Sequence, residues 1–387
     1  MQVSSSSFHN IDIICFSLSR WDSPVSSPAV SMAKEFAKEH RVFFIEHPYS
    51  YKDYLKERKG SNIYKEGNVT IITPPLVYPI NFLSEGKLYD HLSGINNNIL
   101  LKPLKKIIRQ NNISRYIFIN FFNPFFLQKR PFSINPEKYI YQCMDDISQV
   151  KYTRKHGLRL EEEIIARADY TLCTSHELTR LKSPLSERVF FHPNAADTAL
   201  FNKAADKLFE RPADMNYPDR KIIGFTGSIE YRTDFELLKQ IALSHKDKII
   251  YLIGPVYGEE HIDAGLLSIP NITFAGPRDI DKLPAYLQYF DCAIIPYKKT
   301  ILTRSIYPLK INEYLAAGLP VVTTDFSEDI YSFHANAYVV ESREAFIEAI
   351  DIAINEDNEQ KKQQRLAAAA LNSWTKRVSE FWDIISK

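Results

Sequence analysis

Lys310 and Glu313 are the residues whose types and spacing point most directly to chemistry. They lie three positions apart in a stretch of helical pattern, so they share one face of a helix about one turn apart. A lysine in the first turn of a helix, together with the free N–H groups there, is suited to hold phosphate. A glutamate on the same face can accept hydrogen bonds from hydroxyl groups. The alternative is a solvated ion pair, which contributes little to stability.

The stretch around this pair carries signals for both ends of a helix. Pro308 suits the first helical turn, where its missing N–H would have no partner anyway. Gly318 followed by Pro320 ends the helix. Apolar runs at residues 291–297 and 319–324 predict buried strands on either side. The helix therefore begins at the carboxyl ends of strands, which is where open α/β sheets bind their ligands.

Residues 308–322, PLKINEYLAAGLPVV, resemble the donor-sugar segment of the GT-B glycosyltransferases. The resemblance is to the group 1, family 4-like members of the polysaccharide and teichuronic-acid biosynthesis type. It implies that Glu313 binds ribose or sugar hydroxyls of a nucleotide sugar, that Lys310 holds the diphosphate, and that Tyr307 lies against the donor. Retaining members of this group have a first glutamate at the position of Ser305. A serine can hydrogen-bond a hydroxyl or phosphate oxygen there, but it cannot act as an anion.

Two turns in the second half are further candidates for donor binding. Gly227 and Ser228 follow an apolar run, and glycine lets the backbone approach an anionic ligand closely. The resemblance implies a basic residue on the diphosphate shortly after this turn, and Arg232 is the nearest candidate, although its spacing is offset. It also implies that the Gly-Pro-Arg turn ending in Arg278 reads the nucleotide base. An ordinary tight turn with a surface arginine would have the same sequence.

Two pairs of aspartates could serve as a catalytic base or a metal site. Asp145 and Asp146 follow an apolar run, and mutual repulsion of adjacent carboxylates can raise one pKa into the range of a general base. If the reaction inverts configuration, Asp145 or Asp146 is the candidate base, and Glu313 is the other candidate catalytic residue. Asp279 and Asp281 form an Asp-x-Asp, which we interpret as a helix cap rather than a metal site. The GT-B resemblance implies catalysis without a metal ion or other cofactor.

The sequence offers fewer candidate residues for binding the acceptor than for binding the donor. Trp21 and Asp22 lie in the loop after the first apolar run and are the candidate acceptor contacts. Residues 100–110, LLKPLKKIIRQ, set leucine and isoleucine opposite lysine and arginine. Such a stretch can rest on an anionic membrane surface, or it can be an ordinary half-buried helix.

Composition is typical of a globular chain of 387 residues with room for two cores, with 45% hydrophobic and 25% charged residues. Residues 1–205 carry 27 Lys and Arg against 20 Asp and Glu, whereas the remainder carries 21 against 27. The basic first half favours an anionic surface or substrate, but no zinc-finger, RNP-like or basic-helix motif supports nucleic-acid binding. The four scattered cysteines lack metal or redox spacing and predict buried thiols in a reducing compartment.

No apolar run reaches the length of a membrane span, and residues 1–10 lack the basic and apolar regions of a signal peptide. Apolar runs that alternate with helical patterns predict a doubly wound α/β sheet, built twice. A Pro-rich, charged stretch at residues 204–220 predicts the linker between the two. We therefore expect an acceptor-side domain over 1–205, a donor domain over 206–370 and a helix over 371–387. The resemblance implies that the two domains face each other across a cleft and that this helix crosses back to the first domain.

The predicted function is a glycosyltransferase of the hexosyltransferase type that moves a sugar from a nucleotide diphosphate to a hydroxyl acceptor. The resemblance makes a lipid-linked or growing cell-surface glycan the expected acceptor, with the enzyme on the cytoplasmic membrane face. Two alternatives remain open. One is a GT-B nucleotide-sugar epimerase, and the other is a catalytically silent nucleotide-sugar-binding scaffold, which the serine at position 305 keeps open.

Overall fold

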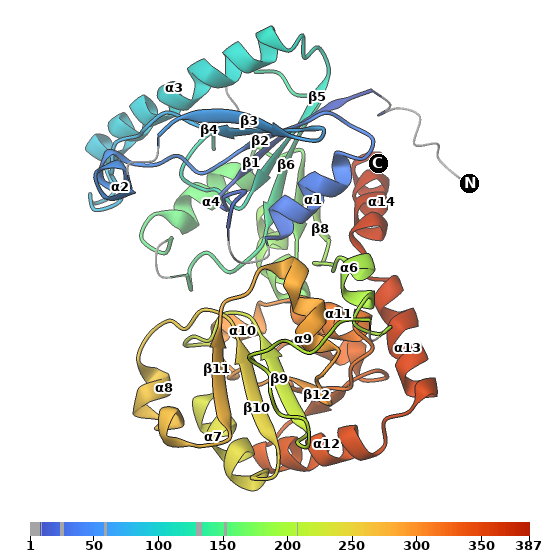
Figure 1. Cartoon of the computed structure of the whole chain (residues 1–387). Coiled ribbons are helices and arrows are strands. Elements are labelled where there is room, and N and C mark those ends of the chain that lie inside the picture. The colour runs from blue at the N-terminus through green and yellow to red at the C-terminus, as the bar shows by residue number, and fades with distance from the viewer. Residues whose placement is uncertain are drawn as a thin grey trace. The chain divides into compact units, whose positions relative to one another are not determined.

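The computed structural model describes residue 8 and residues 10–23, 27–57, 60–128, 134–150, 153–206 and 208–387 (Figure 1). The chain divides into two compact units. The first comprises residues up to Ser23, Ser27–Pro193 and Val378–Lys387, and the second comprises Asn194–Arg377. Each unit is an α/β domain with its own sheet.

The first unit contains an eight-stranded sheet in the order β3-β4-β2-β1-β5-β6-β7-β8. All neighbouring strands are parallel except the pair β3–β4. The strands are β1 (Asp12–Ser17), β2 (Val42–Ile45), β3 (Asn62–Glu66), β4 (Val69–Thr73), β5 (Tyr116–Phe121), β6 (Lys138–Cys143), β7 (Tyr170–Cys173) and β8 (Val189–Phe191). The helices are α1 (Pro28–Phe36), α2 (Tyr51–Glu57), α3 (Lys87–Gln110), α4 (Gly157–Ile165) and α5 (His176–Lys182).

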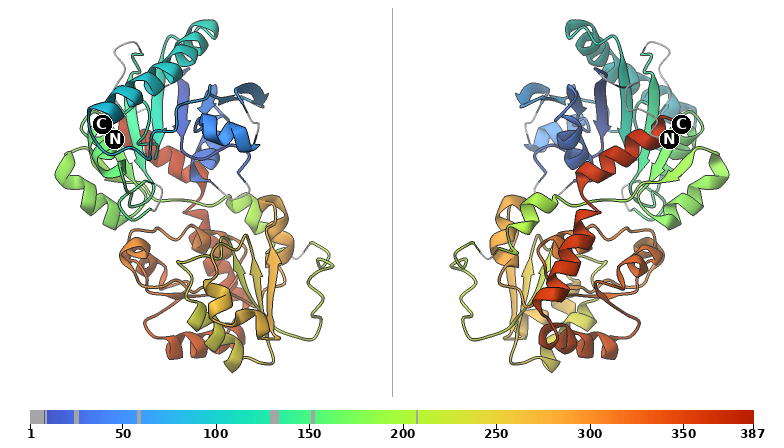
Figure 2. Two further views of the ribbon diagram at one scale, coloured as in Figure 1. Left: turned by 90° about the vertical axis from the view of Figure 1, so that its left-hand side faces the viewer. Right: turned by 90° about the vertical axis from the view of Figure 1, so that its right-hand side faces the viewer.

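Helices cover this sheet on both faces. Every residue of β1 is buried, as expected for the central strand of a parallel sheet. Ile14 and Phe16 of β1 join one core cluster with α3 and α4. On another side, Phe36 of α1 packs edge-on against Phe381 of the C-terminal helix α14 (Trp374–Ile385), with ring centroids 5.0 Å apart. The predicted return of the C-terminal helix to the first domain is therefore confirmed (Figure 2).

The second unit contains a six-stranded, wholly parallel sheet in the order β11-β10-β9-β12-β13-β14. Its strands are β9 (Ile222–Thr226), β10 (Ile249–Ile253), β11 (Ile272–Gly276), β12 (Cys292–Ile295), β13 (Val321–Thr324) and β14 (Tyr338–Val340). Its helices are α6 (Thr198–Asn202), α7 (Phe235–Ser244), α8 (Glu260–Asp263), α9 (Leu283–Leu287), α10 (Ile301–Arg304), α11 (Leu309–Ala316), α12 (Arg343–Asn355) and α13 (Glu359–Ala370). The strand order reverses between β9 and β12, which defines the switch point of this sheet.

Helix α11 ends as its sequence predicts. Gly318 adopts a φ of 74°, which is the left-handed conformation that glycine tolerates best. The Leu319 N–H then donates to the Tyr314 carbonyl at 3.0 Å, closing the helix end. The buried Arg365 of α13 donates two further hydrogen bonds to the Gly318 carbonyl, at 3.0 and 2.8 Å. The start differs by one residue, because Pro308 precedes the helix at the N-cap position instead of opening it.

The predicted doubly wound architecture is confirmed in both units, with two local differences. Strand β3 was not expected, because its residues are all exposed and carry no apolar run. The C-terminal helix expected over residues 371–387 is α14, which begins only at Trp374, after a break that separates it from α13. The two helices separate at residues 371–373, where the Asn372 carbonyl accepts a hydrogen bond from the Ala196 N–H instead of continuing the helix.

The basic stretch at residues 100–110 belongs to α3. Its apolar side chains Leu100, Leu104 and Ile107 are buried in the core of the first unit. Of a membrane-surface stretch and an ordinary half-buried helix, it is therefore the half-buried helix. Its apolar face packs into the core and is not available to a membrane. Within the described ranges, none of the helices combines the length and apolar character needed to cross a bilayer.

Candidate functional site

The turn after β9 is built around the close approach of Lys310 to Gly227. Gly227 adopts a φ of 124°, which side-chain-bearing residues rarely adopt. A Cβ atom on Gly227 would lie 2.1 Å from Lys310 Cε and 2.6 Å from its Nζ. A Cβ on Gly254, at the end of β10, would lie 2.0 Å from the Gly227 carbonyl oxygen. Only glycine at these two positions lets the strand ends and the lysine pack so closely.

Tyr314 fixes helix α11 to the end of β9. Its buried hydroxyl oxygen accepts a hydrogen bond from the Thr226 N–H at 2.8 Å, and it lies 3.2 Å from the Thr226 hydroxyl. Lys310 lies one turn earlier on α11, with its Nζ 5.8 Å from the ring centroid of Phe225 and 5.9 Å from that of Tyr297. The helix thus holds the lysine amine over the end of the sheet.

A pocket of about 100 Å³ opens where these groups meet. It is formed by the segments that follow β9, β10 and β11 and by the first residues of α11. Because β9 adjoins the switch point of the sheet, the pocket lies where doubly wound domains bind ligands. Its lining residues are Thr226, Gly227, Ser228, Ile253, Gly254, Pro255, Pro277, Arg278, Ile280, Leu283, Leu309, Lys310 and Glu313.

Five of the sequence-predicted donor residues therefore come together, namely Gly227, Ser228, Arg278, Lys310 and Glu313. Sequence reasoning missed the wall made by Gly254 and Pro255. A signal for it was present, because β10 and β11 both end in the same Gly-Pro dipeptide.

Glu313 has an unusual electrostatic setting. Its side chain is buried, with 6% of its surface exposed. Burial raises the pKa of this carboxyl group to about 7, against an opposing effect of the Lys310 charge. Glu313 can therefore exchange a proton near neutral pH, and it changes from a hydrogen-bond donor to a pure acceptor when it does so.

Arg278 is held in place by partners on two sides. Its Nη2 pairs with Asp214 at 2.5 Å, and its Nε donates to the Tyr286 hydroxyl at 2.8 Å. The Tyr286 hydroxyl donates in turn to Asp214 at 3.0 Å. Partial burial raises the pKa of Asp214, but the hydrogen bonds from Arg278 and Tyr286 outweigh this effect, so the pKa lies below its usual value. The guanidinium therefore reaches the pocket wall as a fixed positive group.

Three other predicted donor residues do not line this pocket. Arg232 forms an ion pair with Glu230 and lies 5.9 Å from the Tyr297 ring centroid. Ser305 is buried, and its hydroxyl has no hydrogen-bond partner in the described part of the chain. Tyr307 is also buried, and its hydroxyl accepts from Asn312 Nδ2 at 3.3 Å. Their roles toward a donor remain predictions.

The predicted catalytic aspartates follow β6 in the first unit. Asp146 is buried and accepts hydrogen bonds from the N–H and the hydroxyl of Ser148, at 3.0 and 2.7 Å. Asp145 is half-buried. The role of either residue as a base is untested.

The Asp-x-Asp sequence does not form the helix cap that we expected. Asp279 makes no side-chain capping bond and instead pairs with Lys282 at 3.2 Å. Among the described residues, no cluster of three or more His, Cys, Asp or Glu side chains could hold a metal ion.

Trp21 and Asp22 lie near the edge of the first sheet that is formed by β3, β4 and β2. The Trp21 indole N–H donates to Glu66 of β3 at 2.8 Å, and its backbone N–H donates to Glu46 at 2.8 Å. Asp22 lines a hollow of about 340 Å³ together with Glu46, Tyr64 and Thr73. Contact of either residue with an acceptor remains a prediction.

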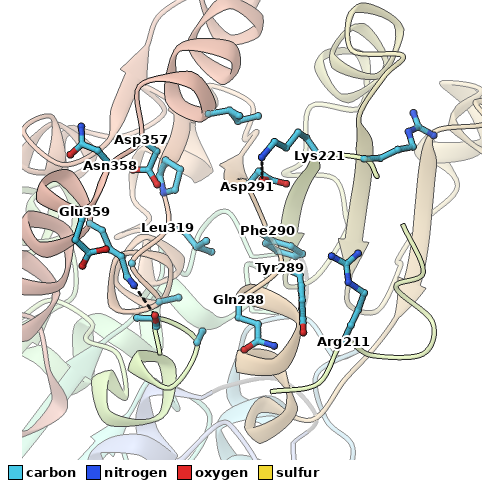
Figure 3. A pocket seen from close by; sticks show the side chains of 18 of the residues that line it. Arg211, Lys221, Gln288, Tyr289, Phe290, Asp291, Leu319, Asp357, Asn358 and Glu359 are labelled. Atoms are coloured by element: carbon cyan, nitrogen blue, oxygen red, sulfur yellow. Dashed lines mark hydrogen bonds and ion pairs between the residues drawn. The ribbon is translucent and has the colours of Figure 1, made fainter. Parts of the chain in front are cut away.

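A larger hollow of about 700 Å³ lies elsewhere in the second unit, at the amino ends of β9, β12 and β13 (Figure 3). Both of its lysines have partners. Lys221 pairs with Asp291 at 2.8 Å, and Lys362 donates to the Ala205 carbonyl at 2.7 Å. It lies at the edge of the sheet where parallel domains do not usually bind ligands, so it is a weaker candidate than the smaller pocket.

The family match among known proteins lies within the second unit. Residues 220–356 match the family described as "Glycosyl transferases group 1". A curated relative is a protein of Bacillus subtilis (strain 168) named as a teichuronic acid biosynthesis glycosyltransferase, TuaH, which is 29% identical over 243 residues. The match spans 58% of this chain and 58% of that relative's length.

Solved structures resemble the chain over nearly its whole length. The α,α-trehalose-phosphate synthase of Burkholderia vietnamiensis has a TM-score of 0.72 at 11% identity, with 98% of this chain and 99% of that chain covered. The sucrose-phosphate synthase of Thermosynechococcus elongatus has a TM-score of 0.69 at 15% identity, with 97% and 98% covered. These likenesses concern the fold, and they confirm the predicted GT-B fold.

Proposed function

We propose that the chain, whose residues 220–356 match the group 1 glycosyl transferases, transfers a sugar from a nucleotide-diphosphate donor to a hydroxyl acceptor. The observation that carries the proposal is the contact between Lys310 and Gly227, which holds an amine over the carboxyl ends of β9 and β10. A diphosphate is the part of a nucleotide sugar that such an amine and the nearby backbone N–H groups recognise.

In the proposed reaction, the acceptor hydroxyl oxygen forms a bond to the anomeric carbon while the bond from that carbon to the diphosphate oxygen breaks. The hydroxyl proton leaves to a base or to solvent, and the nucleoside diphosphate departs with the bonding electron pair. Lys310 and the N-terminus of α11 stabilise the negative charge that develops on this leaving group. Glu313, on the same helix face, accepts hydrogen bonds from donor hydroxyls when it is ionised.

The solved relatives add support for the donor. A trehalose-6-phosphate enzyme of E. coli with the same fold, at a TM-score of 0.69 and 13% identity, is bound to UDP-2-fluoro glucose. The relative named for teichuronic acid biosynthesis supports a glycan acceptor. We propose that this glycan is lipid-linked or growing at the cell surface. Asp145 or Asp146 would serve as the base if the reaction inverts configuration.

Incubation with a panel of UDP-, GDP- and dTDP-sugars, with and without glycan acceptors, tests the proposal. Release of nucleoside diphosphate that depends on an acceptor supports a transferase. Interconversion of the sugar without an acceptor would indicate an epimerase, and binding without turnover would indicate a scaffold. Either of the last two results contradicts the proposed function.

Lys310→Ala is the first variant to compare. We expect it to lose donor binding and turnover by at least about tenfold, because a charge-assisted bond to phosphate is removed, while the thermal midpoint changes little. Lys246→Ala, at an exposed lysine of the same unit, is the matched control. A large loss of stability with unchanged turnover would assign Lys310 a structural role instead.

A further inference from the structure

An ion pair that none of the functions above uses is buried inside the first unit. Lys182, at the end of α5, pairs with Glu161 of α4 at 2.6 Å, and the two side chains are 5% and 1% exposed. Burial lowers the pKa of Lys182, but the charge of Glu161 outweighs this effect, so the pKa lies above its usual value. The lysine therefore stays charged in the interior of the protein.

Stability alone does not explain such a pair. Removing two charges from water costs free energy, and apolar residues of similar volume often stabilise a core as well or better. Some proteins retain buried ionic groups because these fix one arrangement of the groups around them. The side chains bound to this pair therefore indicate what it fixes.

Glu161 holds the carboxyl-terminal end of β6. Its Oε1 accepts hydrogen bonds from the Tyr141 hydroxyl at 2.8 Å and from the Cys143 thiol at 3.4 Å. Tyr141 and Cys143 are two positions apart on β6, so their side chains lie on the same face of the sheet. Burial raises the pKa of both groups, so both keep the protons that they donate. Glu161 thus binds β6 at two points just before the strand ends.

The turn that follows β6 is bound to the same groups. The Cys143 thiol also lies 3.7 Å from the Asp145 carbonyl oxygen. Thr174, which follows the neighbouring strand β7, donates from its N–H to the Cys143 carbonyl and from its hydroxyl to the Met144 carbonyl, both at 3.1 Å. Polar contacts therefore connect the buried ion pair to the backbone of the turn that carries the two aspartates.

Asp146 closes this turn. Its side chain accepts from the Ser148 N–H at 3.0 Å, and its carbonyl accepts from the Gln149 N–H at 3.0 Å. The charge of Asp146 is also among the effects that raise the pKa of Lys182, so these two groups interact through the protein interior. A displacement of Asp146 would weaken both backbone bonds, which makes the two amides reporters of the turn.

We propose that Glu161 is a positioning residue that fixes the turn carrying Asp145 and Asp146, with Lys182 as its buried counter-ion. The proposal rests on the transferase function, because it names the residues that hold part of that reaction's machinery in place. A misplacement of about 1 Å at a reacting group can lower turnover about 100-fold. A change at Glu161 should therefore act on turnover although the side chain is buried away from any substrate.

Two double variants separate the acceptor from the charges. Glu161→Leu with Lys182→Met removes both charges and the acceptor, whereas Glu161→Gln with Lys182→Met removes both charges but keeps an acceptor oxygen for the β6 side chains. Neither leaves an unpaired charge in the interior, so their thermal midpoints should be similar. Arg115→Met with Glu137→Leu is the matched control, because it removes an ion pair whose side chains are 48% and 36% exposed at the other end of β6.

Turnover is the first readout. In acceptor-dependent release of nucleoside diphosphate, we expect the kcat of the leucine variant to fall at least about tenfold. The KM for the donor should not change, because the donor pocket lies in the second unit. The glutamine variant should keep its kcat within about threefold of the wild type, and the control should match the wild type.

Amide hydrogen exchange without any substrate is the second readout. The amides of Ser148 and Gln149 should exchange at least about tenfold faster in the leucine variant, because the turn is no longer held. They should exchange at the wild-type rate in the glutamine variant and in the control. Amides of β1 should be unchanged in all three variants.

Wild-type exchange of these two amides in the leucine variant would overturn the proposal. Equal losses in the glutamine and leucine variants would also contradict it, because the acceptor would then not be what fixes the turn. Faster exchange with an unchanged kcat would show that the turn does not serve the reaction. Failure of the transferase function is recognised separately, since the wild type would then release no nucleoside diphosphate with any acceptor, while the exchange rates still decide whether Glu161 fixes the turn.

Discussion

At the scale of single residues, Gly227 is the position at which a small change should affect donor binding most. Gly227→Ala would place a methyl group within 2.1 Å of Lys310 Cε and also force a φ of 124° on an alanine. We expect a stability loss of about 1–3 kcal/mol from backbone strain, and a larger relative loss of nucleoside diphosphate binding from displacement of the lysine.

Gly265→Ala separates these two effects. Gly265 also has a positive φ, of 73°, but an added Cβ there would meet only the Ser268 hydroxyl, at 4.0 Å. Gly265→Ala should therefore lose stability through backbone strain but bind nucleoside diphosphate as the wild type does. Calorimetric titration with UDP and GDP, together with urea unfolding, measures both quantities. Equal binding losses in the two variants would contradict the assignment of this turn to the donor.

The raised pKa of Glu313 predicts that the stability of the protein depends on pH. The unfolded chain releases this proton near pH 4.5, whereas the folded chain keeps it until about pH 7. The native state therefore binds more protons between these values, and stability falls as pH rises from 4.5 to 7, then levels off. Glu313→Gln should remove this loss. We expect the variant to be as stable as the wild type at pH 4.5 and more stable above pH 7, by up to about 3 kcal/mol.

Glu313→Gln should also weaken donor binding above pH 7, because the variant lacks the ionised carboxylate that accepts hydrogen bonds from the hydroxyl groups of the donor. Urea unfolding of both proteins between pH 4.5 and 8 measures the stability difference. Parallel curves over that range would show that Glu313 does not titrate in this interval. A stabilising substitution that impairs binding is the pattern expected of a residue kept for function.

At the scale of elements, helix α11 depends on its attachment to β9. Tyr314→Phe leaves the buried Thr226 N–H without its acceptor, so we expect a loss of about 1–3 kcal/mol in stability. Because Thr226 precedes Gly227, the turn under Lys310 should loosen and UDP binding should weaken. Tyr257→Phe, at an exposed tyrosine, is the control. Unchanged stability would mean that the hydroxyl is not a required partner.

This element also shows what the sequence could predict. Gly318 and Pro320 indicated where α11 ends, and the apolar runs at residues 291–297 and 319–324 indicated β12 and β13, because buried parallel strands have little choice of residue. Strand β3 had no such signal, since all its side chains face solvent.

The prediction of the site stopped at residues whose partners are distant in sequence. Nothing near Arg278 in the sequence indicates that it pairs with Asp214.

At the scale of the whole molecule, two units with separate sheets should differ in their response to a core mutation. Phe381 is fully buried against Phe36, although it lies near the end of the chain. Phe381→Ala should destabilise the first unit by about 3–5 kcal/mol.

Hydrogen exchange can locate that effect. Amides of α1 and β1 should lose protection in Phe381→Ala, whereas those of α11 and β9 should keep it. Leu371→Ala serves as the control, because its side chain is 70% exposed. Equal loss of protection in both units would show that they unfold as one cooperative body.

Arg365 has a consequence for how this protein can be shortened. The family-matched segment stops at residue 356, before the helix that carries this arginine. A fragment with those boundaries would leave the Gly318 carbonyl, in the turn that ends the lysine-bearing helix, without its two guanidinium bonds. Any minimal nucleotide-binding fragment made for crystallography or engineering therefore has to extend through α13, beyond the end of the family match.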